Sequence, residues 1–378
     1  MASTATSHPL QQRKRHGGWR WGDPIGNRRF ALLFRRRQLN LESGARLGPI
    51  TIAYESWGQL NAARDNGVLL LHGFSGDSHA AGPAGPGHGI RGWWDGLIGP
   101  GLAIDTDRYF VVCTNVLGGC QGSTGPAGLA PDGKPWGSRF PQLTIRDQVE
   151  AEVAFADHMN ILEWHALIGG SMGGMRALEW AIGHPERVKR LVLLATTARC
   201  TAENIAFHNC QIQAIRQDPD FLGGDFYDCP SGGPVDGLAL ARSIARLTYG
   251  CEREINMRIS AAGTEATEDG ITTFLAREGR GFVERLDANS YILLTQAMSG
   301  HDVGRGRGGV AAALARITAR ARVVSVSSDR LFPPHRQQEL AMAIGKRVTY
   351  TSIESHLGHD GYLEEQSQLK SVLRQSLG

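Results

Sequence analysis

The heptapeptide Gly169-Gly170-Ser171-Met172-Gly173-Gly174-Met175 constrains the fold of this chain more than any other stretch. It follows the apolar run 165–168 and precedes residues 176–182, whose composition suits a helix. The sequence therefore predicts a buried strand, a sharp turn and a helix. Ser171 would stand at the helix N-terminus, where free N–H groups favour developing negative charge.

A serine held between glycines at a strand-to-helix turn is typical of the nucleophile elbow of α/β-hydrolases. The glycines allow strand and helix to approach each other without Cβ clashes. A glycine-rich structural turn is the alternative, since the chain has 49 glycines. The strand and helix on either side favour the elbow.

Further apolar runs predict the strands of an α/β-hydrolase fold, with a mostly parallel central sheet and helices on both faces. The runs occupy residues 67–71, 108–114, 190–196, 322–328 and 347–353. A helix is expected near 144–160. Residues 39–44 and 50–55 alternate about a glycine-containing turn, which predicts an antiparallel hairpin.

Helical periodicity replaces strand patterns between about residues 201 and 300, notably in 204–216, 237–248 and 290–298. We interpret this region as a helical lid inserted into the hydrolase core, with a hinge near Ala198 and a return near Val310. The expected domains are a basic, disordered leader (1–38), a core (39–200 and 310–378) and a lid (201–309).

Charge and composition narrow the choice of partners. The chain carries 40 Lys plus Arg against 37 Asp plus Glu, a net charge of +3, which does not favour nucleic acid as the main partner. The basic leader could instead be a nucleic-acid or localisation patch. It lacks a signal-peptide apolar segment, and nowhere do about 18 apolar residues run consecutively, so we expect a cytoplasmic protein without a membrane span.

The remaining members of a catalytic triad follow Ser171 in the order that this fold uses, acid and then histidine. Asp329 directly follows the strand predicted at 322–328, and His359 lies in the loop after the next strand. His356 is a competing base. Glycines at 358 and 361 favour His359, although spacing alone leaves the choice open.

Backbone donors for an oxyanion are predicted at the ends of two strands. The His72-Gly73 pair ends the strand at 67–71, so the amide of Phe74 is one candidate, and the amide of Met172 after the serine is the other. Cys120 could in principle be a nucleophile, but no elbow surrounds it, and the six cysteines show no metal-binding spacing. We expect reduced thiols and no metal.

Beyond these residues, several longer motifs resemble the homoserine O-acetyltransferase family from about residue 39 to the C-terminus. The motifs are residues 71–79, 92–96, 115–120, 169–175, 287–291, 301–306 and 358–361. The resemblance implies ping-pong transfer of an acetyl group from acetyl-CoA, as a co-substrate, to L-homoserine in methionine biosynthesis, with no bound cofactor. It also implies a homodimer formed through the lid.

The same resemblance places substrate-binding residues at Arg242, Tyr249 and Asp360. A guanidinium suits the carboxylate of an amino acid, and a carboxylate suits its ammonium group. Arg242 could otherwise be an exposed helix cation, with Arg246 as the true partner. Succinyl-CoA as donor, L-serine as acceptor, esterase activity and an inactive hydrolase fold used as a binding module are the alternative functions.

Overall fold

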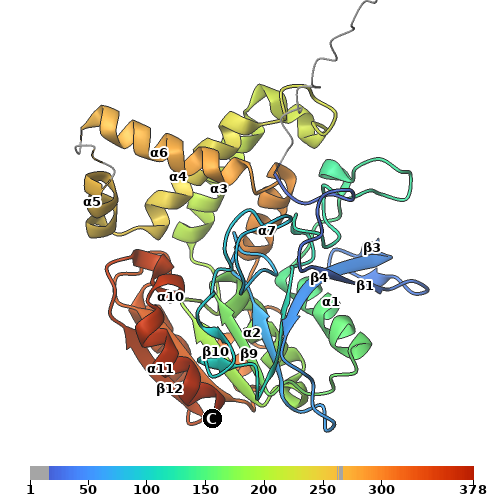
Figure 1. Cartoon of the computed structure of the whole chain (residues 1–378), viewed down its shortest axis with the longest axis vertical. Helices are drawn as coiled ribbons and strands as arrows, with labels where there is room; N and C mark the ends of the chain where they lie inside the picture. The colour runs from blue at the N-terminus through green and yellow to red at the C-terminus, as the bar shows by residue number, and fades with distance from the viewer. Residues whose placement is uncertain (1–16, 262, 264–266) are drawn as a thin grey trace, which may run out of the picture.

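An eight-stranded sheet runs through the molecule in the computed structural model, which describes residues 17–261, 263 and 267–378 (Figure 1). In spatial order its strands are β1 (Arg29–Leu33), β4 (Ile50–Trp57), β8 (Phe110–Thr114), β5 (Gly67–Leu71), β9 (Ala166–Gly170), β10 (Arg190–Leu194), β11 (Arg320–Val326) and β12 (Val348–Ile353). Neighbours from β8 to β12 are parallel, whereas β4 runs antiparallel to β1 and β8. The sheet is therefore mostly parallel, as predicted.

Helices cover both faces of this sheet. The core helices are α1 (Ile145–His158), α2 (Met172–Gly183), α8 (Val310–Leu314), α9 (Pro334–Ile344), α10 (Gly361–Glu364) and α11 (Gln366–Leu377). Alternate residues of β5 serve opposite faces: Leu69 and Leu71 join the apolar cluster that contains α1 and α2, while Val68 and Leu70 join the one that contains α11. This burial on both faces confirms the predicted α/β-hydrolase architecture. In the described ranges, no helix is long and apolar enough to cross a membrane.

Five of the six described α-helices between β10 and β11 form a cap beyond the sheet (Figure 1). They are α3 (Ala202–Arg216), α4 (Val235–Tyr249), α5 (Glu252–Ala261), α6 (Glu268–Val283) and α7 (Ala288–Ser299). The three helices expected from periodicity between about residues 201 and 300 correspond to α3, α4 and α7.

Short 3-10 turns also occur along the chain. They are η1 (Gly137–Arg139), η2 (Pro185–Arg187), η3 (Pro219–Gly224) and η4 (Gly358–Asp360), and of these only η3 lies in the cap.

The cap joins the core through a neck of two paired segments. The amide of Cys200 donates to the carbonyl of His301 at 3.2 Å, and the amide of Val303 donates to the carbonyl of Ala198 at 3.0 Å. The chain thus leaves the core near Ala198, as expected, and returns at Val303 rather than near Val310.

The leader expected for residues 1–38 is wrong for its described part. Residues 29–33 form β1, and Ala31 and Leu33 are buried in the core. Arg28, which contributed to the basic character, is 5% exposed and donates to the carbonyls of Gln121 and Gly87. The positive charge of this segment therefore satisfies interior carbonyls. Residues 1–16 lie outside the described residues.

The hairpin expected between residues 39–44 and 50–55 is also wrong. Two short strands, β2 (Leu39–Asn40) and β3 (Arg46–Leu47), pair with each other, and β4 instead pairs with β1 and β8. A second short ladder joins β6 (Ile98–Gly99) to β7 (Ile104–Asp105). The apolar alternation of β4 thus reflects burial within the main sheet.

Candidate active site

Ser171 occupies the sharp turn between β9 and α2. Its backbone has φ 55° and ψ −123°, a conformation that is costly for a residue with a side chain and that persists only where surrounding structure enforces it. A Cβ on Gly169 would lie 2.3 Å from the carbonyl oxygen of Gly173, so this approach of strand and helix requires glycine. The amide of Ser171 donates to the Leu194 carbonyl at 2.9 Å, which fixes the turn on β10.

Asp329 and His359 lie in the loops that follow β11 and β12. Nδ1 of His359 donates to Oδ2 of Asp329 at 2.8 Å, and both side chains are buried. The other oxygen of Asp329 accepts the amides of Leu331 and Phe332 at 2.8 and 3.0 Å. The aspartate is thus held by its own loop, and it fixes the tautomer of the imidazole.

The second ring nitrogen of His359, Nε2, is buried. Within the part of the chain that the structure describes, Nε2 has no hydrogen-bond partner. Burial lowers the pKa of His359, but the charge of Asp329, the hydrogen bond to it and the charge of Asp360 outweigh burial, so the pKa is raised above 6.5. Such a group accepts a proton readily near neutral pH.

The two expected oxyanion donors meet beside Ser171. Met172 is the first residue of α2, and the helix offers no acceptor for its amide. Phe74 lines the same cavity as Ser171, and a Cβ on the preceding Gly73 would be 3.6 Å from the Cβ of Ser171. The end of β5 and the start of α2 are therefore adjacent, as an oxyanion hole built from these two amides requires.

A buried polar cluster fixes the end of β5. Nδ1 of His72 lies 2.7 Å from the carbonyl of Gly73, and its Nε2 accepts the amide of Val116 at 3.1 Å. Burial, followed by the charge of Arg176, lowers the pKa of His72 to about 3, so the ring is neutral. Arg176 of α2 donates to the carbonyl of His72 and pairs with Glu152 of α1. The helix after Ser171 is thereby fixed to the end of β5, the strand that leads to Phe74.

A narrow, largely apolar cavity surrounds Ser171. Its lining comes from the core and from lid helices α3, α4 and α7, and comprises Phe74, Ser171, Phe207, His208, Gln211, Thr248, Tyr249, Met298, Leu331 and Phe332. Tyr249 and Phe332 also contact the ring of His359, with centroids 5.7 and 5.4 Å away. Ser171 and the lid thus line one cavity, and two of its lining residues contact the ring of His359.

Two arginines one turn apart on α4 have different surroundings. Arg242 makes no ion pair with any described residue, and its guanidinium lies 4.6 Å from the ring centroid of Phe282 and 5.4 Å from that of Tyr249. Arg246 is 1% exposed and pairs with Glu254, Glu278 and Asp360. Of the two, only Arg246 is neutralised by described carboxylates, and the choice between them as a binding residue stays a prediction.

Comparison with known proteins decides the family. The family model for the alpha/beta hydrolase fold matches residues 66–366. Homoserine O-acetyltransferase of Thermobifida fusca (strain YX) is 52% identical over 367 residues, which cover 96% of each chain. The chain belongs to the homoserine O-acetyltransferase family. That of Mycobacterium tuberculosis (strain ATCC 25177 / H37Ra) is 49% identical over 347 residues, 90% of this chain and 91% of the relative.

Solved structures of similar proteins include homoserine O-acetyltransferases and esterases. The enzyme from Bacillus anthracis superposes with a TM-score of 0.84 at 28% identity, covering 93% of this chain and 97% of that chain. Esterase E22 superposes with a TM-score of 0.85 at 27% identity, covering 93% and 99%. The resemblance noted from the motifs is therefore confirmed.

The rival histidine and the cysteine occupy positions unsuited to catalysis in a homoserine O-acetyltransferase site. His356 is exposed, and Asp329 pairs with His359 instead. Cys120 is buried, and burial followed by the charge of Asp287 raises its pKa to about 12, so it stays a thiol.

One buried cluster in this family member has residue types that bind metals. Glu55, His79 and His88 bring their ligand atoms within 4.8 Å of one another. The two imidazoles are stacked, however, with centroids 3.9 Å apart and planes 11° from parallel, so one ion cannot lie in both ring planes. Nδ1 of His79 already contacts Glu55 at 2.9 Å, and Nε2 of His88 accepts the amide of Asn27. The cluster fits a set of hydrogen bonds between β4 and the loop that follows β5, not a metal site.

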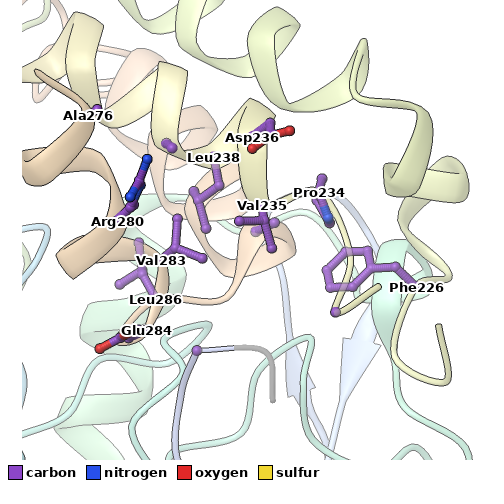
Figure 2. A pocket seen from close by; sticks show the side chains of 14 residues that line it. Phe226, Pro234, Val235, Asp236, Leu238, Ala276, Arg280, Val283, Glu284 and Leu286 are labelled. Atoms are coloured by element: carbon purple, nitrogen blue, oxygen red, sulfur yellow. The ribbon is translucent and has the colours of Figure 1, made fainter. Parts of the chain in front are cut away.

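A larger cavity of about 630 Å³ lies elsewhere in the lid of this homoserine O-acetyltransferase homologue. Figure 2 shows apolar side chains around it from α4, from the end of α6 and from the turn after α6, including Leu238, Val283 and Leu286, with Arg280 and Glu284 nearby. Its described lining contains no serine, cysteine or histidine. Unlike the smaller cavity at Ser171, it therefore offers no side chain of these three nucleophilic types.

Sequence reasoning missed the buried charges that support the site of this family member. Arg176 follows the elbow closely, and a cation inside an otherwise apolar helix could have indicated an internal ion pair. Glu254 and Glu278, the lid partners of Arg246, offer no such signal because they resemble ordinary acidic residues on exposed helices.

Proposed function

We propose that this chain transfers an acetyl group from acetyl-CoA to the hydroxyl of L-homoserine, giving O-acetyl-L-homoserine for methionine biosynthesis. The reaction proceeds by a ping-pong mechanism through an acetyl ester of Ser171. One observation carries the proposal: His359 is paired with Asp329 at 2.8 Å, its Nε2 has no described hydrogen-bond partner, and its ring contacts Tyr249 and Phe332, which line the cavity of Ser171. The chain is also about half identical to homoserine O-acetyltransferases.

In the first half-reaction, Oγ of Ser171 attacks the thioester carbonyl while Nε2 of His359 accepts its proton. The amides of Phe74 and Met172 stabilise the oxyanion, and one such donor contributes about 3 kcal/mol. The tetrahedral intermediate then expels the CoA thiolate, which takes the proton from His359. Acetyl-CoA is a co-substrate, and the mechanism requires no resident cofactor or metal.

In the second half-reaction, the hydroxyl of L-homoserine gives its proton to His359 and attacks the acetyl ester. Arg242 binds the α-carboxylate and Asp360 the α-ammonium group, with Tyr249 closing the space between the lid and His359. Ser171 regains its proton from His359 when the product leaves. The apolar lining of the cavity disfavours water as a competing acceptor.

Hydrolysis of acetyl esters is the second candidate, supported by the structural likeness to esterase E22. An esterase would use the same Ser171, Asp329 and His359 with water as acceptor. Arg242 and Asp360 favour the transferase because water needs neither charge for binding.

The test measures CoA release by the purified protein with acetyl-CoA or succinyl-CoA, each with L-homoserine, with L-serine or without acceptor. We expect turnover only with acetyl-CoA and L-homoserine, and none from Ser171→Ala. Equal release without acceptor would establish hydrolysis instead. Turnover with succinyl-CoA or L-serine would reassign the donor or the acceptor.

We also propose that the protein acts as a cytoplasmic homodimer formed through the lid. Lid helices α3 and α4 carry the exposed apolar residues Ile205, Leu240 and Leu247, at 43%, 54% and 47% exposure. Sedimentation of Leu240→Asp/Leu247→Asp should report a monomer. Leu162→Asp is the matched control, because Leu162 is 78% exposed and lies outside the lid. This substitution should leave the dimer intact.

A further inference from the structure

Arg246 of α4 lies at the meeting point of the lid and the catalytic loop. Its guanidinium donates to Oδ2 of Asp360 at 3.4 Å, pairs with Glu254 of α5 and lies 3.5 Å from Glu278 of α6. Asp360 directly follows His359 in the chain. One buried cation therefore connects three lid helices to the residue beside the candidate catalytic base.

Negative charge exceeds positive charge in this cluster. Four carboxylates, from Glu254, Glu278, Asp360 and Glu364, surround two guanidinium groups, from Arg246 and Arg258. In the pair of Arg246 and Asp360, the arginine is the less accessible to solvent, since its side chain is 1% exposed whereas that of Asp360 is 22% exposed. Because the lid glutamates already neutralise Arg246, Asp360 keeps its charge for a cationic ligand.

The spacing along α4 relates this cluster to Arg242, the other residue expected to bind an amino acid. Arg242 and Arg246 are four residues apart and so lie on the same face of the helix. Arg242 has no ion-pair partner among the residues described, while Arg246 is fixed to Asp360. The helix therefore sets the separation between a free cation and a fixed anion.

We propose that Arg246 is a positioning residue for the acyl acceptor, which holds Asp360 at the correct distance from Arg242 for the two charges to bind one α-amino acid. This inference rests on the proposed function, because it takes Arg242 and Asp360 as the groups that recognise the acceptor. Arg246 itself touches neither the acyl group nor Ser171. Its loss should therefore impair acetyl transfer to the acceptor and spare acetylation of the enzyme.

The test separates the two half-reactions in Arg246→Lys. A single burst of CoA release without acceptor measures acetylation of Ser171, and steady-state turnover measures transfer to L-homoserine. We expect the burst rate to stay near that of the parent, with kcat/KM for L-homoserine lower by up to about 100-fold, as a misplacement of roughly 1 Å can produce. Arg216→Met, at an exposed cation of α3, is the control and should change neither.

Acceptor analogues provide a second readout that simple loss of lid packing would not change. 4-Hydroxybutyrate lacks the ammonium group that Asp360 would bind. In the parent, L-homoserine should be strongly preferred to it, and in Arg246→Lys this preference should shrink. Equal loss of burst and transfer rates, or an unchanged preference, would overturn the proposal.

Glu278→Gln is a second test variant, which keeps the proposal testable if Arg246→Lys does not fold. It keeps the pair between Arg246 and Asp360 but frees Arg246 from α6, so the same selective loss should appear to a smaller degree. Unchanged acceptor kinetics in this variant would also count against the proposal. The proposed function fails separately, before any variant is made, if the parent does not use L-homoserine.

Discussion

Gly173 packs against the end of β5 so closely that a Cβ built on it would lie 1.8 Å from the carbonyl oxygen of Leu71. The neighbour is backbone, so no side-chain rotation relieves the clash. The helix that begins after Ser171 can therefore dock on the strand that leads to Phe74 only if residue 173 has no side chain.

Gly173→Ala should consequently lower the free energy of unfolding by about 1–3 kcal/mol, the usual range for overpacking, or more if the helix cannot shift. Urea unfolding followed by circular dichroism measures the change. Gly183→Ala is the control at the end of the same helix, where a Cβ meets nothing within 4 Å. It should be neutral or stabilising by up to about 1 kcal/mol. Equal effects of the two substitutions would contradict the argument.

The choice between the two histidines is open to a direct comparison. His359→Ala removes the only imidazole paired with Asp329 among the described residues and should reduce kcat by roughly 10⁴-fold or more. His356→Ala truncates an exposed side chain and should retain activity near that of the parent. The measurement is acetyl-CoA turnover with L-homoserine. A larger loss in His356→Ala would reverse the assignment.

The pH dependence of acetylation should report His359. Because Asp329 and Asp360 together outweigh burial and raise its pKa, kcat/KM for acetyl-CoA should rise with pH through an inflection above 6.5. Asp360→Asn removes one of the charges that favour the imidazolium, so the inflection should move to lower pH. An inflection that stays in place would show that Asp360 does not act on His359.

Acid should destabilise the fold through three buried histidines. Burial lowers the pKa of His72 to about 3 and those of His208 and His301 to about 4, so below pH 6.5 the unfolded chain binds protons that the folded protein excludes. Stability is fully present above pH 6.5 and should fall as the pH drops toward 4.

Urea unfolding at several pH values measures this slope. His208→Gln removes one titrating group and retains a polar side chain that can reach Ser299, the present partner of His208 at 2.9 Å. Its slope between pH 6.5 and 4 should be shallower than that of the parent. An identical slope would show that His208 does not contribute.

The sharp turn at Ser171 and the pair of Asp329 and His359 were predictable because each depends on local backbone demands. A serine between glycines after an apolar run has few structural interpretations, and Asp329 follows its strand directly. β1 was not predicted because the arginines around it suggested a segment exposed to solvent. Arg28 is instead buried and donates hydrogen bonds to interior carbonyls. The pairs of Arg246 depend on residues 8 and 114 positions away, so only the folded chain brings them together.

The paired segments Ala198–Cys200 and His301–Val303 make the cap a closed loop inserted into the core, because the same hydrogen bonds fix both of its ends. The entropy of closing such a loop grows slowly, by about 0.6 kcal/mol for each doubling of its length. Helices can therefore be lengthened, shortened or exchanged within the cap at little cost to the strands that hold Ser171, Asp329 and His359. Evolution can then alter what the enzyme accepts as an acyl acceptor while leaving the acyl-forming chemistry in place.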